Sequence, residues 1–416
     1  MADRLESPSR VPSRGDAKST SQCRGEYKHM HGPFRRALPI VTTAFAHAAA
    51  HAQGSLFAGE QFPTGYQPHG VLARDLNADG FMDLATADRN TNEVSVLLGN
   101  GTGLFAPTQP LSVGFQPVSI AVGTLNADTN PDIATADYAG GTVSILIATA
   151  PGTFAAAVSI PVGTRPSAIA IGDLNHDGID DIVVSDELAN RIAVLIGAPS
   201  GVFGAPTVLT VGSAPAHVAI GRLNADAHAD IITANAGSSN VSVLLGNGAG
   251  SFAAATQFAT GPSPRWVSIG DVNADGRSDV AVATSGTSAI SLLLQNGFGF
   301  AASTSIDVYS PPTCTGLVDI NGDGLLDLVA SGSGTYSAVT TRIGDGTGGF
   351  GAVGVGAHYA LATGPHDGEQ HLHAMHAIPK QVGMVRLQMT GAIHRAAQHV
   401  SHLFVIAHTK DARAET

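Results

Sequence analysis

Cysteine and tryptophan are scarce in this 416-residue sequence, which contains two cysteines and one tryptophan. Two cysteines cannot build the disulfide framework on which small secreted domains depend. The single tryptophan, Trp266, excludes repeat families that carry a Trp-Asp signature in every unit. Stability must therefore come from packing or from bound ions.

Lysine is absent from residues 54–356, which contain 8 arginines and 25 aspartates and glutamates, a net charge of −17. Such a surface repels nucleic acids and anionic membranes. We therefore predict no nucleic-acid partner and no membrane insertion. Catalytic signatures are missing as well, since no H-E-x-x-H, G-x-S-x-G or Cys-His arrangement occurs. The sequence thus predicts that the protein is not an enzyme.

The sequence contains six copies of a nine-residue loop, which begin at Asp75, Thr124, Asp173, Arg222, Asp271 and Asp319. The spacing between successive copies is 49, 49, 49, 49 and 48 residues. A fixed period near 50 residues indicates one supersecondary unit that stacks on itself.

Four of the loops have oxygen-bearing side chains at positions 1, 3, 5 and 9 and glycine at position 6. With the backbone carbonyl of position 7, they offer five oxygen ligands, which suits Ca²⁺ better than Mg²⁺. A hairpin turn alone needs only Asp-Gly. We therefore predict about four Ca²⁺ sites. The predicted ligands are Asp75, Asn77, Asp79, Phe81 and Asp83; Asp173, Asn175, Asp177, Ile179 and Asp181; Asp271, Asn273, Asp275, Arg277 and Asp279; and Asp319, Asn321, Asp323, Leu325 and Asp327.

The other two loops are degenerate at positions 1 and 6. The second copy has Thr124 and Thr129 there, and the fourth has Arg222 and Ala227. We expect the Arg222 guanidinium to replace the cation and to pair with Asp226 and Asp230.

Each unit also contains four short segments rich in valine and isoleucine. In the third unit they are 168–172, 181–185, 191–196 and about 206–211, separated by Gly, Pro and Asn. Helical periodicity with caps is missing from the repeats, so we predict an all-β fold. Four-stranded sheets repeated radially form a β-propeller. The sequence therefore predicts a propeller of four-stranded blades with six visible repeats of about 49 residues, in a seven-bladed plan.

The flanking segments divide the chain into four regions. Residues 1–29 are either a polar extension or the result of a mis-assigned start, with translation beginning at Met30. A predicted signal peptide follows at residues 30–52, with Arg35 and Arg36, a short apolar run and a final Ala50-His-Ala52. The propeller spans residues 53–357. The histidine-rich residues 358–416 are either a diverged seventh blade or a tail read out of frame. The signal predicts a secreted or cell-surface protein.

At these residues the chain resembles a known family. The loops, the preceding Ile171-Gly-Asp-Leu-Asn175 and the turns at 98–105 and 245–252 look like FG-GAP repeats, the blades of integrin alpha chains and of bacterial VCBS-type repeat proteins. The resemblance implies a seven-bladed propeller, calcium between the first two strands of a blade, and a role in adhesion or sugar binding.

We call the six nine-residue loops the cation loops. Strand alternation places them at one end of the propeller, together with the Gly-rich turns such as 98–105 and 245–252. The opposite end carries the connections between blades, with exposed candidates for sugar stacking or protein contact. These candidates are Tyr66, His69, Phe115, Gln116, Arg165, His217, Arg265, Trp266 and Tyr309. We expect Arg265 and Trp266 to be the best ligand-binding pair, although such aromatic residues often serve packing alone.

Three functions remain open from the sequence. The first is a secreted or surface calcium-binding propeller that binds an extracellular glycan or protein. The second is a structural repeat module that calcium only stiffens. The third is a propeller enzyme that acts on an extracellular polymer.

Overall fold

The computed structural model of the chain describes residues 62–108, 110–297, 299–333, 338–351 and 358–360. Every regular element in these ranges is a β-strand. No helix in the described ranges is long and apolar enough to cross a membrane. Residues 1–61 and 361–416 lie outside the described part, and so do the predicted signal peptide and most of the histidine-rich segment.

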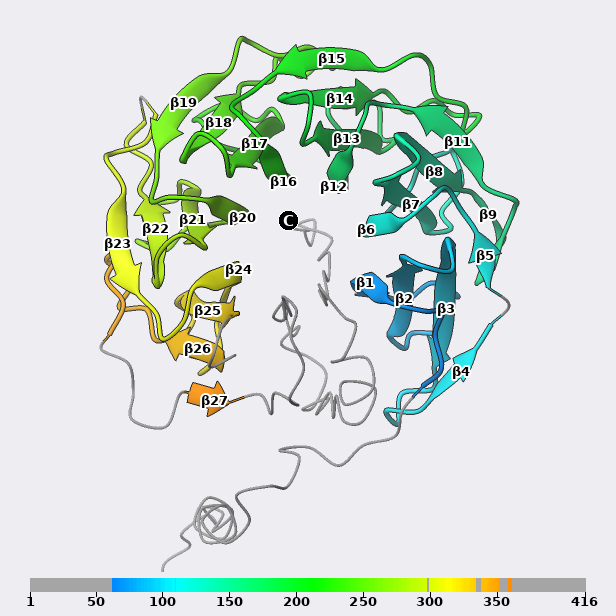
Figure 1. Ribbon diagram of the computed structural model, residues 1–416, viewed down its shortest axis with the longest axis horizontal. Coiled ribbons are helices and arrows are strands. Elements are labelled where there is room, and N and C mark those ends of the chain that lie inside the picture. The colour runs from blue at the N-terminus through cyan, green and yellow to red at the C-terminus, as the bar shows by residue number, and fades with distance from the viewer. Residues whose placement is uncertain (1–61, 109, 298, 334–337, 352–357, 361–416) are drawn as a thin grey trace, which may run out of the picture. The chain divides into compact units, whose positions relative to one another are not determined.

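The described strands form six large sheets in chain order, which we call blades 1 to 6, and one separate two-stranded sheet (Figure 1). Blade 1 contains β1 (Pro68–Arg74), β2 (Asp83–Asp88), β3 (Glu93–Gly99), β4 (Phe105–Pro107) and β5 (Leu111–Ser112). Blade 2 contains β6 (Pro117–Gly123), β7 (Asp132–Asp137), β8 (Thr142–Leu146) and β11 (Val158–Pro161), with the small hairpin β9 (Ala148–Ala150) and β10 (Thr153–Phe154). Blade 3 contains β12 (Pro166–Gly172), β13 (Asp181–Asp186), β14 (Arg191–Leu195) and β15 (Thr207–Thr210).

The remaining blades repeat the same plan. Blade 4 contains β16 (Pro215–Gly221), β17 (Asp230–Asn235), β18 (Asn240–Leu244) and β19 (Thr256–Ala259). Blade 5 contains β20 (Pro264–Gly270), β21 (Asp279–Thr284), β22 (Ala289–Leu293) and β23 (Thr304–Asp307). Blade 6 contains β24 (Pro312–Val318), β25 (Asp327–Gly332), β26 (Ala338–Arg342) and β27 (His358–Ala360).

The register within a blade fixes the position of the cation loop. In blade 3, Gly172 of β12 pairs with Asp181 of β13, so the loop residues between them close a hairpin at that edge. The antiparallel ladder then runs back to Pro166, where the pairing shifts by one residue. Blade 5 repeats this register, with Gly270 opposite Asp279. Because the register repeats, every cation loop lies at the same end of its blade.

The hydrophobic core lies between neighbouring blades. The second strands β7, β13, β17 and β21 are buried along their whole length, as expected for sheets covered on both faces. One cluster joins Ala134 and Val143 of blade 2 to Ile169 and Ile182 of blade 3. The blades therefore pack face to face, and each contributes apolar side chains to two cores.

The first strand of each blade is the innermost strand in Figure 1, and successive first strands contact one another from β1 through β6, β12, β16 and β20 to β24. The described residues contain no comparable contact between β24 and β1. The predicted all-β propeller of four-stranded blades is confirmed, and the number of blades in the complete ring stays a prediction.

Two details of the strand pattern refine the prediction. In blades 4, 5 and 6 the phenylalanine after the Gly-rich turn closes that turn, as Phe252 does by pairing with Gly246, and the fourth strand begins further along the chain. Blade 6 takes its fourth strand, β27, from residues 358–360, beyond the predicted end of the repeats.

Candidate functional site

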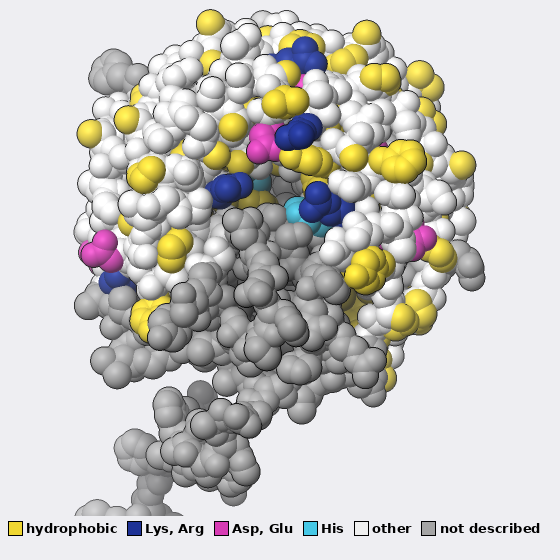
Figure 2. All heavy atoms as spheres, viewed as in Figure 1, with side chains coloured by type: hydrophobic (Ala, Val, Ile, Leu, Met, Phe, Trp, Pro, Cys, Tyr) yellow, Lys and Arg dark blue, Asp and Glu magenta, His cyan; other side chains and the backbone are white. Residues whose placement is uncertain are grey.

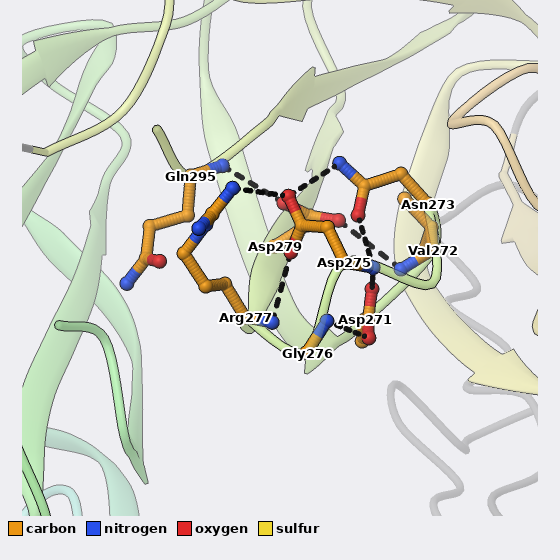
Figure 3. Close-up of polar contacts among 8 residues, drawn as sticks. All are labelled: Asp271, Val272, Asn273, Asp275, Gly276, Arg277, Asp279 and Gln295. Carbon is orange, nitrogen blue, oxygen red and sulfur yellow. Dashed lines mark hydrogen bonds and ion pairs between the residues drawn. The ribbon is translucent and has the colours of Figure 1, made fainter. Parts of the chain in front are cut away.

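Each cation loop joins the first two strands of its blade and is anchored by the aspartate at position 9. In blade 5, Asp279 Oδ2 accepts a hydrogen bond from the backbone N–H of Val272 at 3.1 Å, and Oδ1 accepts one from Gln295 at 2.8 Å (Figure 3). The Asp279 side chain is fully buried. Its carboxylate therefore ties the loop to the end of the third strand.

The same two hydrogen bonds occur in all six blades, including the degenerate ones. Asp132 accepts from Leu125 and Ala148, and Asp230 accepts from Leu223 and Gly246. The fold thus requires the position 9 aspartate whether or not a cation binds. The sequence pattern alone assigned this residue only to the metal, because it could not show the buried backbone donors that face it.

Positions 3 and 5 also interact in every loop. Asn273 Nδ2 donates to Asp275 Oδ2 at 3.0 Å, and the Asp275 backbone N–H lies 3.2 Å from Asn273 Oδ1. Asp275 Oδ1 accepts from the Arg277 backbone at 2.9 Å, and the Arg277 guanidinium pairs with Asp275 Oδ2 at 2.9 Å. Both partners in that ion pair are partly exposed, so it adds little stability.

Position 1 separates the four complete loops from the two degenerate ones. Asp75, Asp173, Asp271 and Asp319 each accept from the N–H of the position 6 glycine, at 2.8 to 3.0 Å. In these loops the residue at position 4 also has a positive φ, between 57° and 82°. The position 4 residues are Ala78, His176, Ala274 and Gly322. Ala127 and Ala225, at position 4 of the degenerate loops, do not take this conformation.

The left-handed conformation costs a residue with a side chain about 1 kcal/mol. Three of the complete loops accept this cost, and the position 6 glycines take φ values of 81° to 88°. A shared strained backbone therefore accompanies the full set of oxygen ligands. This geometry suits a loop that wraps its oxygens around one centre.

The carboxylates of a complete loop repel one another. Burial raises the pKa of Asp181 to about 6 against the opposing hydrogen bonds from Gly197 and Leu174, and the charges of Asp177 and Asp173 raise it further. Burial also raises the pKa of Asp279, and Asp275 and Asp271 add to the effect. A divalent cation would relieve this repulsion.

The donor set fits calcium in its chemistry, since carboxylate, amide and carbonyl oxygens are hard ligands. The described residues contain no cluster of three or more His, Cys, Asp or Glu side chains in metal-binding arrangement. Each position 9 oxygen accepts a hydrogen bond from a backbone N–H, as those of Asp279 do. Each such oxygen keeps a second lone pair.

The expected ion pair of Arg222 is absent from the described residues. Asp230 uses its two oxygens for Leu223 and Gly246, and Asp226 accepts from Asn224 and His228. Arg222 is exposed instead. The prediction of an internal salt bridge was wrong, because the exposed Arg222 does not pair with Asp226 or Asp230 in the described loop.

The connections between blades lie at the opposite end, as predicted. The backbone N–H of Asn90, after β2, donates to Tyr66 O at 3.0 Å, and Ala139, after β7, donates to Phe115 O at 3.1 Å. Each turn between second and third strands therefore lies against the turn that enters its own blade. Tyr66, Phe115 and Tyr309 are exposed there.

Arg265 and Trp266 differ in their surroundings. The Trp266 ring stacks on the buried His217 ring, with centroids 3.5 Å apart, and packs against the core between blades 5 and 6. Burial lowers the pKa of His217 to about 3, so this imidazole is neutral. Arg265 is exposed, and its Nε lies 3.4 Å from Ser285 Oγ. Arg265 thus faces solvent, whereas Trp266 contributes mainly to packing.

The sequence reasoning missed a second set of buried carboxylates, at the end of the second strands. Asp88 accepts from the backbone N–H of Gly65 at 3.0 Å and from the hydroxyls of Ser95 and Thr86. Asp137 and Asp186 occupy the same place in blades 2 and 3. The repeat period was the available signal, since these aspartates recur at the same spacing as the cation loops.

A cluster around Tyr138 was also missed. The guanidinium carbons of Arg89 and Arg165 lie 5.8 Å and 5.6 Å from the Tyr138 ring centroid. The Tyr138 hydroxyl donates to Glu187 Oε2 at 3.0 Å. Only Arg165 of this cluster was recognised, because the turns after the second strands looked like plain connections.

A family model described as an FG-GAP-like repeat matches the chain in five overlapping stretches, 75–135, 125–184, 173–233, 222–282 and 271–330. Together they cover more than half of the 416 residues. Each stretch begins at a cation loop and ends in the second strand of the next blade. No curated protein matches the chain.

Solved structures share the fold at low identity. A putative 6-phosphogluconolactonase from Bacteroides uniformis is 17% identical with a TM-score of 0.53, over 73% of this chain and 88% of the other. A protein from Lactobacillus plantarum is 17% identical with a TM-score of 0.52, over 69% and 83%. A functionally unknown protein from Desulfotomaculum acetoxidans is 14% identical with a TM-score of 0.52, over 71% and 88%. At these identities the likeness extends to the fold alone.

Proposed function

This chain belongs to the FG-GAP-like repeat family, and from that premise we propose that it is a secreted or cell-surface calcium-binding β-propeller that binds an extracellular glycan or protein. The observation that carries the calcium part is the contrast between loops. The four loops with a full oxygen set share one strained backbone conformation, and the two degenerate loops lack it.

Calcium would be held by the side-chain oxygens at positions 1, 3, 5 and 9 and by the carbonyl at position 7. A bound ion would neutralise carboxylates that otherwise repel one another. In blade 1 the ion would act on Asp83, whose pKa is raised by burial and further by the two charges of Asp79 and Asp75. The position 9 aspartate itself holds the base of the hairpin closed through its two backbone hydrogen bonds.

The binding part of the proposal concerns the opposite end of the propeller. The connections between blades present exposed Tyr66, Phe115 and Tyr309 there, together with exposed Arg265. Aromatic and arginine side chains dominate binding hot spots, and loops on a rigid scaffold commonly carry them. Calcium at the far end would stiffen the scaffold that positions these loops.

A purely structural module is the second candidate, and the position 9 aspartates favour it. Their hydrogen bonds hold the hairpin base in all six blades, independently of any ligand. In that case calcium would change stability without any partner on the other face.

Two measurements on the full chain separate the candidates. Calorimetric titration with Ca²⁺, with the melting temperature recorded in Ca²⁺ and in EDTA, should give about four ions and a clear rise in melting temperature. No heat and no shift would remove the calcium part.

A glycan and matrix-protein array in Ca²⁺ then tests binding. Binding that falls with Arg265→Ala and is kept in Arg222→Ala, which removes an exposed arginine at the opposite end, supports the binding module. An array without any ligand, after confirmed calcium binding, would favour the structural module.

A further inference from the structure

Three neighbouring blades bring a set of turns together on the face opposite the cation loops. In each blade the residue after the second strand bonds to the turn that enters the blade. Arg89 N–H donates to Gln67 O at 2.9 Å, Tyr138 to Gln116 O at 2.9 Å and Glu187 to Arg165 O at 3.0 Å. These backbone bonds give Arg89, Tyr138 and Arg165 fixed positions on blades 1, 2 and 3.

The side chains form a stack across the blade boundaries. The Arg89 and Arg165 guanidinium groups both lie over the Tyr138 ring, within 6 Å of its centroid, the range of a cation–π contact. Arg89 Nη2 also donates to Gln116 Oε1 at 3.3 Å, and the Tyr138 hydroxyl is held by Glu187. A guanidinium held against a ring keeps its N–H edge available for a planar acceptor.

The charges of this cluster stand out against the rest of the domain. Residues 54–356 contain 25 acidic residues and 8 arginines. Even so, within the described part of the chain neither Arg89 nor Arg165 forms an ion pair, although Arg191 and Arg277 each have one. Figure 2 shows arginine side chains gathered near the middle of the face in view, with an acidic group beside one of them. The cluster contains two guanidinium groups and one carboxylate, that of Glu187, so its net charge is +1 and it can take an anion from outside.

Exposed aromatic rings flank the two guanidinium groups. Tyr66 is 52% exposed and its backbone bonds to the turn that carries Arg89. Phe115 is 68% exposed and its backbone bonds to the turn that carries Tyr138. Large exposed rings beside arginine offer an apolar face next to a bidentate hydrogen-bond donor.

We propose that Arg89, Tyr138 and Arg165, with Phe115 and Tyr66 beside them, form a binding site for a carboxylate-bearing sugar polymer. The guanidinium edges would bind the sugar carboxylates, and the exposed rings would cover the C–H faces of the sugar rings. This inference rests on the proposed function of the protein as a binding module. It adds the class of ligand and places the binding site at residues other than Arg265.

A polymer fits better than a single anion because the cluster repeats along the ring of blades. Blade 1 contributes the Tyr66 ring and the Arg89 guanidinium, blade 2 the Phe115 and Tyr138 rings, and blade 3 the Arg165 guanidinium. A chain of sugar acids likewise presents several C–H ring faces and several carboxylates along its length. An acidic peptide would match the charges but not the exposed rings.

The probe for this site is a short oligogalacturonide, whose fully methyl-esterified form keeps the sugar rings and removes the charges. Calorimetry in Ca²⁺ should detect binding of the oligogalacturonide to the full chain and should detect none of the ester. The affinity for the oligogalacturonide should fall as the salt concentration rises. Arg165→Gln should weaken binding about tenfold, the size of one lost charge-assisted hydrogen bond. Arg89→Gln with Arg165→Gln should abolish it.

The matched control is Arg222→Gln, which removes the same charge from an exposed arginine on the other end and should bind like the parent. Melting curves of each variant exclude unfolding as the cause of any loss. Phe115→Ala is a second test variant, since it leaves the charge unchanged and should still weaken binding.

Three outcomes would overturn the proposal. The first is an equal affinity for the esterified and the charged probe, and the second is an unchanged affinity in Arg165→Gln. The third is binding of poly-glutamate with the same affinity as the oligogalacturonide and with no effect of Phe115→Ala. The last result would identify a peptide site read by charge alone. If the array finds a ligand that depends on Arg265 and not on Arg165, this inference fails and the proposed function stands.

Discussion

The aspartate at position 9 of the predicted cation loops has a structural role of its own. Its carboxylate is buried and accepts two backbone hydrogen bonds in every blade, and it stays aspartate in the two loops that lack the usual residues at positions 1 and 6. Loops without the full set of oxygens therefore still need this carboxylate. Position 1, by contrast, changes freely where the other ligands are incomplete.

Asp230→Asn tests this division in a degenerate loop. The amide places an N–H₂ group against a buried backbone donor, so we expect the free energy of unfolding to fall by about 1 to 3 kcal/mol. Calcium stoichiometry should not change, because loop 4 is not a predicted site. Urea denaturation in EDTA measures the first effect and calorimetry the second.

Asp226→Asn is the control, since Asp226 is exposed at position 5 of the same loop. It should shift the free energy of unfolding by less than about 0.5 kcal/mol. An equal loss in the two variants would contradict the assigned role of position 9.

Asp88 gives the protein a pH dependence outside the cation loops. Burial raises its pKa from 3.8 to about 6, although Ser95, Thr86 and Gly65 donate to it. The folded state therefore holds a proton between about pH 4 and 6 that the unfolded chain has released. Its contribution to stability is fully present below about pH 4 and is lost as the pH rises through about 6.

Asp88→Asn should remove this component. Blade 4 already has Asn235 at the same place, where Oδ1 accepts from Thr233 and Nδ2 donates to Ser242, so the fold accommodates the amide. We expect the effect of the substitution on the free energy of unfolding to be more favourable at pH 7 than at pH 4. The two effects should differ by on the order of 3 kcal/mol at most. Denaturation curves at several pH values in EDTA check this. A parallel pH dependence in variant and parent would refute it.

At the scale of the element, the cation loop has one hairpin frame and a separable set of ligands. The loops of blades 2 and 4 keep the hydrogen bonds between positions 3 and 5 and those of position 9. They lack the bond from position 6 to position 1 and the positive φ at position 4. The complete conformation is thus coupled to positions 1 and 6.

Restoring those two positions should restore the site. The double variant Arg222→Asp and Ala227→Gly gives loop 4 the oxygen set of its neighbours and a glycine able to take positive φ. We expect one more bound Ca²⁺ per molecule by calorimetry. Arg222→Asp alone, without the glycine, should bind much more weakly, and an unchanged stoichiometry in the double variant would reject the idea.

Much of the fold could be predicted because the repeat reports the same element six times. In blade 3 the predicted segments 181–185 and 191–196 match β13 and β14 to within a residue. What could not be predicted depends on contacts between distant segments. One partner of Asp230, the backbone N–H of Gly246, comes from beyond the end of β18, and the His217 ring that stacks on Trp266 comes from the neighbouring blade. Composition and period carry no information on such pairs.

At the scale of the whole molecule, the propeller concentrates negative charge at one end. The cation loops lie at that end, and the turns that carry Arg89 and Arg165 lie at the opposite end. Residues 54–356 have a net charge of −17, which four divalent cations would reduce to −9. Without cations, the loops of adjacent blades repel one another across the ring.

Salt should therefore stabilise the calcium-free protein more than the calcium-bound protein. Sodium chloride at about 0.5 M reduces the screening length to a few ångströms, which weakens repulsion between separate loops. In EDTA we expect the melting temperature to rise clearly between about 0.02 M and 0.5 M salt, and in excess Ca²⁺ to change much less. Differential scanning calorimetry at constant pH makes the comparison.

Choline chloride at the same ionic strength controls for sodium bound in the loops, because it screens without fitting an oxygen site. Equal salt effects with and without Ca²⁺ would mean that the loop carboxylates do not govern stability at this scale. A rise with sodium alone would place a monovalent ion in the sites assigned to calcium.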